Sequence, residues 1–343
     1  MNETWLGCQD TSIWRLGRFA QGAGFSLYAE NIFKVNWMGS STTDNLVIRS
    51  KAPDWFHACI ADPGESRFTN VQDCKVHYLY WPSKSISNAN LLLVHGGGGH
   101  AHWWSFLAPI FSEDMNVAAI SLSGMGDSGW RSHYDSDIRV ADMREVISAA
   151  GFGDPTYVVG HSFGGFMASR FGQLHGEELA GVIIVDTPIR PPHRKEVEKK
   201  RRPRMGNKRY YATFNEALTR FRLMPTQSCD NEFLVEHIAR HSLTLDSKGW
   251  CWKWDGAAME NQRFGEPFHD YLASAKCRKA FIFGEKSALI DDETRLFIKG
   301  LIGESSPMVG IPEAHHHLML DQPMAFIEAV RGILSSWQSV QFG

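Results

Sequence analysis

The 343-residue chain has no apolar run that approaches the roughly 18 residues of a membrane-spanning helix. Its six cysteines are scattered and form no Cys-x-x-Cys pair. Net charge is also small, since 35 Lys and Arg against 38 Asp and Glu give −3. This balance provides no overall attraction to nucleic acid or to an anionic membrane. With 43% hydrophobic and 21% charged residues, the composition excludes a disordered, collagen-like or coiled-coil chain.

The start of the chain lacks the basic segment and apolar core of a secretory signal peptide. We therefore expect reduced thiols and a cytoplasmic protein. Residues 1–50 are rich in Gly, Ser, Trp and Phe without a clean period. We expect them to form an N-terminal extension that packs on the main body or on a partner subunit, which leaves a homo-oligomer open.

Short apolar segments alternate with helical ones from residue 55 onward. The first two strands should form an antiparallel lead-in, and the later ones, separated by helices, are typical of a parallel sheet covered on both faces. Ligands bind such sheets at the carboxyl ends of the strands, where each glycine-rich or polar motif of this chain falls. Strands are predicted at 55–60, 74–81, 90–94, 116–121, 156–159, 181–185, 279–283 and 308–311, and helices at 137–150, 163–174 and 324–337.

Residues 187–277 interrupt the alternation and are predicted to form an inserted, mainly helical cap, which leaves 51–186 and 278–343 as the core. Ten Lys and Arg against two Glu lie between residues 190 and 209. A solvated, mobile lid helix is the simplest interpretation, and steering of acidic substrates is the alternative. Trp250, Trp252 and Trp254 alternate and would share one face of an extended segment. We expect them to pack the cap on the body and in part to line a pocket.

The pentapeptide Gly160-His161-Ser162-Phe163-Gly164 matches G-x-S-x-G directly after a predicted strand and before a predicted helix. A nucleophile elbow requires this context, because the tight turn holds the serine hydroxyl above the sheet. The helix N-terminus also stabilises developing negative charge. Ser162 is therefore the predicted nucleophile.

A second glycine-rich motif, HGGGGH at residues 95–100, follows an earlier strand. Glycines allow backbone N–H groups to approach a ligand closely, so we predict an oxyanion hole made by the N–H groups of Gly97 and Phe163. A phosphate-binding loop is the rival interpretation, but the motif lacks GK[ST].

A nucleophilic serine needs a base and an acid that orients it. Three adjacent histidines, residues 315–317, lie between the last strand and the final helix and contain the candidate base. We predict no metal there, because adjacent residues rarely face one ion and no carboxylate has ligand spacing beside them. Asp186 competes with Asp291 and Asp292 for the role of acid. Asp186 is favoured, since it stands at its strand end, whereas Asp291 or Asp292 precedes a helix and suits an N-cap.

The order HGGGG, SGMGDSG, GHSFGG, strand-end acid and HHLMLDQP resembles the α/β-hydrolase superfamily from about residue 55 to the C-terminus. The resemblance implies the α/β-hydrolase fold and its Ser…Asp…His order. Setting Pro323 on the family proline that opens the last helix puts the base at His316, with His315 in place of the usual Gly. The commonest family acid follows G-x-x-D, where this chain has Ser287. Many haloalkane dehalogenases instead place the acid after the earlier strand, and Asp186 matches that arrangement.

The nucleophile also separates subfamilies, because haloalkane dehalogenases and epoxide hydrolases use Asp where this chain has Ser162. The resemblance thus implies a serine hydrolase that cleaves a carboxylic ester or lactone-type acyl bond of an apolar or aromatic small molecule. A carbon–carbon bond hydrolase of a ring-cleavage diketone and a hydrolase-fold ligand receptor are the alternatives. No cofactor, metal, nucleic acid or membrane is expected to take part. The predicted substrate-binding residues are Gly98, His100, Trp103, Trp104, His161 and Trp252.

Overall fold

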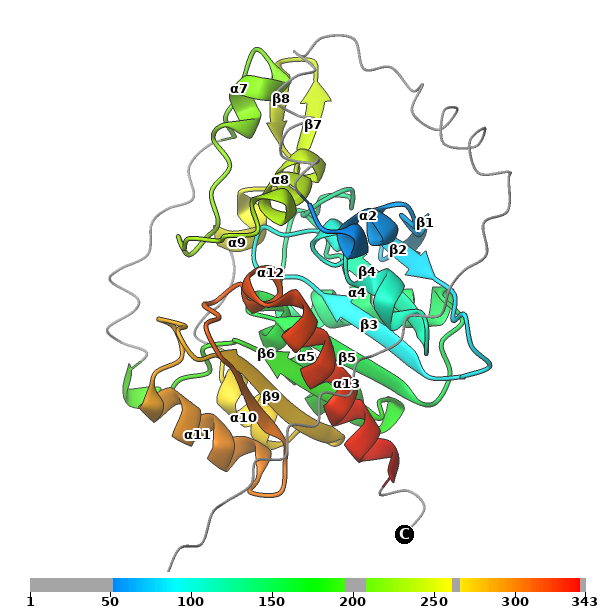
Figure 1. Cartoon of the computed structure of the whole chain (residues 1–343), viewed down its shortest axis with the longest axis vertical. Coiled ribbons are helices and arrows are strands. Elements are labelled where there is room, and N and C mark those ends of the chain that lie inside the picture. Colours follow the sequence, from blue (N-terminus) through cyan, green and yellow to red (C-terminus); the bar gives the residue numbers. More distant parts are fainter. Residues whose placement is uncertain (1–51, 195–207, 261–265, 340–343) are drawn as a thin grey trace, which may run out of the picture. The chain divides into compact units, whose positions relative to one another are not determined.

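The computed structural model describes residues 52–194, 208–260 and 266–339 (Figure 1). The predicted N-terminal extension and most of the basic stretch, residues 195–207, lie outside the described residues.

Eight strands form one sheet in the order β1-β2-β4-β3-β5-β6-β9-β10. Strand β2 is antiparallel to β1 and β4, and all other neighbours are parallel. The predicted α/β-hydrolase architecture, a mostly parallel sheet with an antiparallel lead-in, is therefore confirmed. The strands are β1 (Glu65–Val71), β2 (Cys74–Trp81), β3 (Asn90–Val94), β4 (Asn116–Ser121), β5 (Thr156–His161), β6 (Gly181–Val185), β9 (Arg278–Gly284) and β10 (Met308–Ile311).

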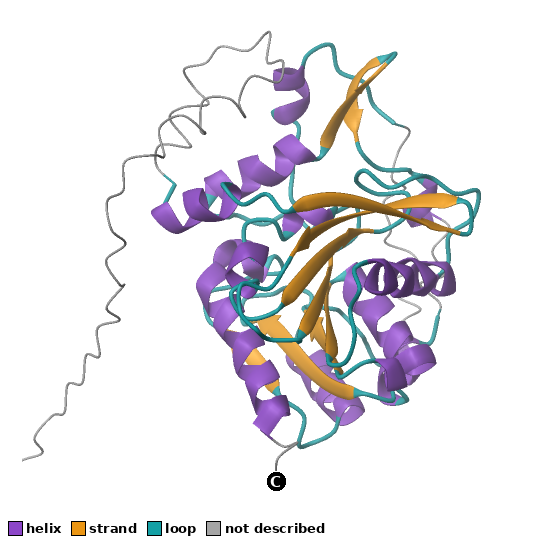
Figure 2. Ribbon diagram, turned by 90° about the vertical axis from the view of Figure 1, so that its right-hand side faces the viewer, coloured by secondary structure: helices purple, strands orange, loops and turns teal. Residues whose placement is uncertain are grey.

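Helices cover both faces of this sheet (Figure 2). In β3, Leu91 and Leu93 belong to one hydrophobic cluster, whereas Leu92 and Val94 belong to the other. Burial on both faces explains why the central strands are apolar throughout. One cluster includes α2 (Asp54–Ile60), α3 (Ala108–Phe111), α12 (Leu318–Asp321) and α13 (Pro323–Ser339), and the other includes α4 (Ser136–Ala149), α5 (Phe163–His175), α10 (Phe268–Ala273) and α11 (Asp292–Ile302).

The start of the core corrects one expectation, because residues 55–60 form helix α2 and not a strand. A six-residue apolar run is too short for periodicity to separate the two structures. Asp54 in the first turn interacts favourably with the helix dipole. The antiparallel partner of β2 is instead β1, whose polar, alternately exposed residues are typical of an edge strand.

The described part of the segment between β6 and β9 combines short helices with an antiparallel hairpin and long connecting loops. Leu234 and Ile238 of α8 (Glu232–His241) pack in the same hydrophobic cluster as β3 residues. Phe268 of α10 packs on Phe166 of α5, with ring centroids 4.5 Å apart, so the end of the segment lies beside the sheet. No helix within the described ranges is both long and apolar enough to cross a membrane. The further elements of this segment are α7 (Phe214–Leu218), α8 (Glu232–His241), β7 (Leu243–Asp246), β8 (Gly249–Trp252) and α9 (Ala257–Glu260).

Candidate active site

Ser162 occupies a sharp turn between β5 and α5. Its backbone is left-handed, with φ 51° and ψ −112°, a strained conformation for a residue other than glycine. Its N–H donates to the Val185 carbonyl at 2.8 Å, and its carbonyl accepts from the Gly165 N–H at 3.0 Å. A Cβ atom at Gly160 would collide with the Gly164 carbonyl, and one at Gly165 with the Thr187 hydroxyl. The glycines of the motif are therefore required to make this turn.

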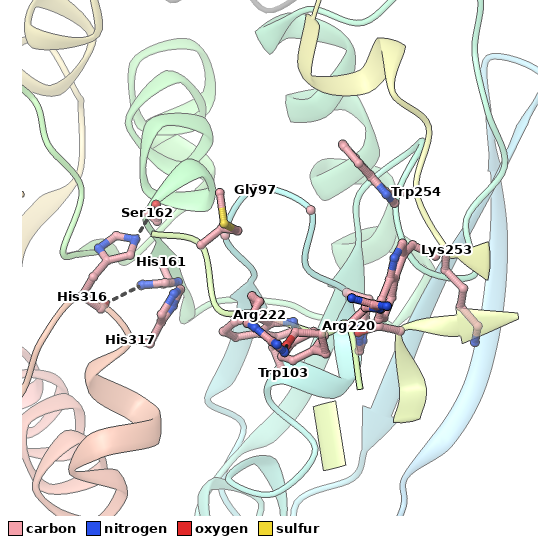
Figure 3. A pocket seen from close by; sticks show the side chains of 17 residues that line it. Gly97, Trp103, His161, Ser162, Arg220, Arg222, Lys253, Trp254, His316 and His317 are labelled. Carbon is pink, nitrogen blue, oxygen red and sulfur yellow. Dashed lines mark hydrogen bonds between the residues drawn. The ribbon is translucent and has the colours of Figure 1, made fainter. Parts of the chain in front are cut away.

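The predicted nucleophile, base and acid form one hydrogen-bonded chain (Figure 3). The His316 Nε2 atom lies 3.0 Å from Ser162 Oγ, and His316 Nδ1 lies 2.7 Å from Asp186 Oδ1. The three residues follow β5, β10 and β6, whose carboxyl ends meet at the same edge of the sheet. His316 and Asp186 are buried, so the interaction between them is little screened by water.

Three donors surround the Asp186 carboxylate. Oδ2 accepts from the Gly284 N–H at 2.9 Å, and Oδ1 accepts from the Ser287 hydroxyl at 2.6 Å as well as from His316. A carboxylate can only accept, so we assign the imidazole proton to His316 Nδ1. His316 Nε2 then presents a lone pair to the hydroxyl of Ser162.

The competing acids have a different role in the structure. Asp291 is the N-cap of α11 and accepts from the Thr294 N–H at 3.0 Å and the Thr294 hydroxyl at 2.6 Å. Asp292 forms an exposed ion pair with Arg295. The structure thus brings Asp186, and neither of these two, to His316.

The glycine-rich loop after β3 lies against the nucleophile. A Cβ atom at Gly96 would lie 3.4 Å from Ser162 Cβ. His95 fixes this loop, since its Nδ1 donates to the Gly96 carbonyl at 2.7 Å and its Nε2 accepts from the Leu122 N–H at 3.1 Å. Burial lowers the pKa of His95 to about 4, which keeps the ring neutral. The N–H groups of Gly97 and Phe163 donate to no acceptor among the described residues. Both groups therefore remain available to a ligand, as an oxyanion hole requires.

A cavity of about 300 Å³ opens beside Ser162. Trp104, predicted to bind substrate, does not line it, because its fully buried ring stacks on Phe326 of α13 with centroids 6.0 Å apart. Trp103 and Trp104 adjoin in a tight 3₁₀ turn, so one faces the cavity and the other the core. The other predicted substrate-binding residues all line the cavity: Gly98, His100, Trp103, His161 and Trp252.

Several lining residues were missed. Most lie in no motif, whereas His317 adjoins the predicted base and Lys253 lies among the alternating tryptophans. Trp254 belongs to the alternating tryptophans, but Trp250, the first of these, instead contacts Phe214 edge-on. The segment after α7 carries no periodic signal that could have placed it at the cavity. The missed lining residues are Arg220, Phe221, Arg222, Met224, Ser242, Lys253 and His317.

Burial keeps three histidines of the cavity wall neutral. It lowers the pKa values of His100 and His161 well below the usual range. It lowers that of His317 to about 3, despite the nearby carbonyls of Met224 and Pro225. His100 Nε2 lies 2.8 Å from Ser242 Oγ, which connects the glycine-rich loop to the end of α8.

Two groups of histidines in the described ranges have ring nitrogens within 4.8 Å of one another and could supply ligands to a metal ion. One group contains His316, and an ion bound there would coordinate the Nε2 lone pair that faces the Ser162 hydroxyl. In the other, His237 Nε2 lies 2.8 Å from Ser105 Oγ. The groups are His161, His316 and His317, and His102, His237 and His241.

The strand order, with Ser162 after β5, Asp186 after β6 and His316 after β10, defines an α/β-hydrolase. The family model described as "Alpha/beta hydrolase family" matches residues 91–329, more than half of the chain. The chain therefore belongs to the alpha/beta hydrolase family.

Known proteins of this fold resemble the chain at low identity. It is 24% identical over 276 residues to Esterase Rv0045c of Mycobacterium tuberculosis, covering 78% of this chain and 88% of that protein. A crystal structure of that esterase gives a TM-score of 0.63 at 20% identity, covering 83% of this chain and 99% of the other. The crystal structure of E-2-(acetamidomethylene)succinate hydrolase gives a TM-score of 0.67 at 17% identity, covering 79% of this chain and 99% of the other. Epoxide hydrolase 4 of Mus musculus is 24% identical over 136 residues, only 38% of each protein.

Proposed function

We propose that the chain is a serine hydrolase that cleaves a carboxylic ester or lactone-type acyl bond of a small molecule. The observation that carries this proposal is the buried hydrogen-bonded chain from Asp186 through His316 to Ser162. The similarity to a mycobacterial esterase supports it.

In the proposed reaction, Ser162 Oγ attacks the acyl carbon while His316 Nε2 takes the hydroxyl proton. Asp186 orients the ring and stabilises the imidazolium. The N–H groups of Gly97 and Phe163 bind the oxyanion, which also lies at the N-terminus of α5. His316 then gives the proton to the leaving alkoxide, which departs as an alcohol and leaves an acyl-enzyme on Ser162. In the second half-reaction His316 takes a proton from a water molecule, which attacks the acyl carbon. The acid is released and the proton returns to Ser162 Oγ.

We also propose that the segment after β6, predicted as a cap over residues 187–277, covers the active site as far as α9. Its residues Phe221 and Trp252 line the cavity. Its α10 end instead packs on α5. The cap therefore supplies the wall that selects the substrate, while the strand ends supply the chemistry.

Labelling with a fluorophosphonate, followed by intact mass and peptide mapping, tests the nucleophile. We expect one adduct on Ser162 and none in Ser162→Ala. Ser169→Ala is the matched control, because this buried serine lies on α5 and donates only to the Gly165 carbonyl. Turnover of aromatic and short-chain esters should disappear in Ser162→Ala alone.

Two results would contradict the proposal: folded wild-type protein without an adduct, or Ser162→Ala with wild-type turnover. Hydrolysis of a ring-cleavage diketone but of no ester would favour the carbon–carbon bond alternative, which uses the same triad. Small-molecule binding without any turnover would favour a receptor.

A further inference from the structure

The cavity has a cationic wall without a compensating acid. Arg220 and Arg222 line it, and no Asp or Glu is found among its described lining residues. In Figure 3, Ser162 lies at one end of the view, and the two arginines lie between it and Lys253. Both arginines come from the short segment that follows α7 in the proposed cap.

The charge of the two arginines has no partner in the described part of the chain. Lys253 is paired, because its Nζ lies 2.6 Å from Asp127 Oδ1. Arg222 Nη1 donates to two backbone carbonyls, those of Thr219 at 2.9 Å and Phe221 at 2.6 Å. The side chain of Arg220 makes no hydrogen bond or ion pair with the described residues. Two guanidinium groups therefore keep donors for a ligand.

Aromatic side chains also contribute to the lining of this cavity. Trp103, Phe221 and Trp252 contribute rings to it. Burial lowers the pKa values of His100 and His161, so these two histidines add no positive charge to the cavity near neutral pH. The cavity lining therefore combines Ser162 and His316, aromatic side chains and two arginines.

We propose that the substrate is an ester that carries a carboxylate at the end remote from the scissile bond, and that Arg220 and Arg222 bind this carboxylate. The proposal rests on the function proposed above and names its substrate class. A guanidinium matches a carboxylate with two parallel hydrogen bonds. An apolar spacer, either a short methylene chain or an aromatic ring, would lie against Trp103 and Trp252.

Two matched pairs of esters test the charge preference on either side of the scissile bond. p-Nitrophenyl hydrogen adipate and p-nitrophenyl methyl adipate differ by a charge in the acyl group. 4-Acetoxybenzoate and methyl 4-acetoxybenzoate differ by a charge in the leaving group. We expect the wild-type protein to favour the acid over its neutral partner by about tenfold in kcat/KM in at least one pair, mainly through KM. Raising NaCl from about 0.05 to 0.5 M should reduce this ratio severalfold.

Variants then assign the preference to the arginines. The ratio of kcat/KM for the acidic ester to kcat/KM for its neutral partner should fall to about one in the double variant Arg220→Gln/Arg222→Gln. Part of this preference should remain in Arg220→Lys/Arg222→Lys, which keeps the charge but lacks the planar guanidinium. Lys248→Gln is the control, because it removes an exposed charge from the β7–β8 turn, outside the cavity. Its ratio should equal that of the wild type.

Equal use of acid and neutral esters, or an unchanged ratio in the double Gln variant, would overturn the carboxylate site while leaving the esterase function intact. The same ratio loss in Lys248→Gln would also overturn it, by showing a general field effect. If the wild type cleaves no ester, the proposed function fails, and calorimetry with monomethyl adipate on Ser162→Ala decides the site separately. If Ser162→Ala binds monomethyl adipate and the binding disappears when Arg220→Gln and Arg222→Gln are added to that variant, the carboxylate site is supported. If Ser162→Ala does not bind it, or if the added substitutions leave binding unchanged, the site is refuted.

Discussion

Replacing Asp186 by Asn tests the geometry of the proposed triad most directly. The carboxylate accepts from Gly284, Ser287 and His316, whereas an amide has only one accepting oxygen. If the new NH₂ takes the Oδ2 position, it faces the Gly284 N–H, donor against donor. If it takes the Oδ1 position, it forces the His316 proton onto Nε2, which can then no longer accept from Ser162.

The loss can be estimated from the contact between the carboxylate and the ring. Unit charges about 4 Å apart interact by about 4 kcal/mol at an effective dielectric constant of about 20. At about 1.4 kcal/mol per factor of ten, the loss of this stabilisation of the imidazolium lowers kcat about 10³-fold. The wrong tautomer adds to the loss, so we expect kcat to fall about 10³- to 10⁴-fold. KM should change little, because Asp186 is fully buried and absent from the cavity lining.

The assay is steady-state hydrolysis of an activated ester, with a thermal melt of each variant to show that it is folded. Asp291→Asn is the matched control, because Asn caps a helix as well as Asp does and α11 should stay intact. Its kcat should stay within about twofold of wild type. A kcat for Asp186→Asn within tenfold of wild type, or an equal loss in Asp291→Asn, would refute the assignment of the acid.

Two further predictions concern groups around the triad. Ser287→Ala removes the 2.6 Å hydrogen bond to Asp186, so kcat should fall about tenfold while the protein stays folded, and an unchanged kcat would contradict a positioning role. Burial lowers the pKa values of His95 and His317 to about 4 and about 3, so below about pH 6.5 the unfolded state binds more protons. For each histidine, the free energy of unfolding should therefore decrease by about 1 kcal/mol per pH unit as the pH falls from about 6.5 toward the pKa in the folded state. Urea denaturation at pH 7.5 and 5.5 measures this loss, which should be smaller in His317→Gln; a pH-independent midpoint would contradict it.

The parts of the fold that sequence reasoning identified are those with a local signal. The boundaries of β3, β4, β6 and β10 follow from short apolar runs that stop at glycine or polar residues. The turn at Ser162 follows from glycines whose absent Cβ atoms are sterically required. Helix α2 and strand β1 were not identified, because a six-residue apolar run and a polar edge strand carry no decisive period.

The position of Ser287 shows how a family pattern and a geometry can differ. The resemblance marks it as the place where the commonest acid is missing. In the structure, its hydroxyl instead donates to Asp186, which reaches His316 from the neighbouring strand β6. Because β6 and β9 are paired, their carboxyl ends lie side by side, and an acid on either strand can serve the same base.

The cavity wall could not be predicted for a related physical reason. The chemistry-bearing residues follow strand ends, and the parallel register of the sheet brings strand ends together whatever the loops contain. Arg220 and Arg222 lie instead in an insertion, whose residues Phe221 and Leu223 pack in the same hydrophobic cluster as α8. The proposed roles thus assign selectivity and chemistry to separate parts of the chain. Substitution of the arginines should therefore change which ester is cleaved, whereas substitution of Asp186 should change how fast any ester is cleaved.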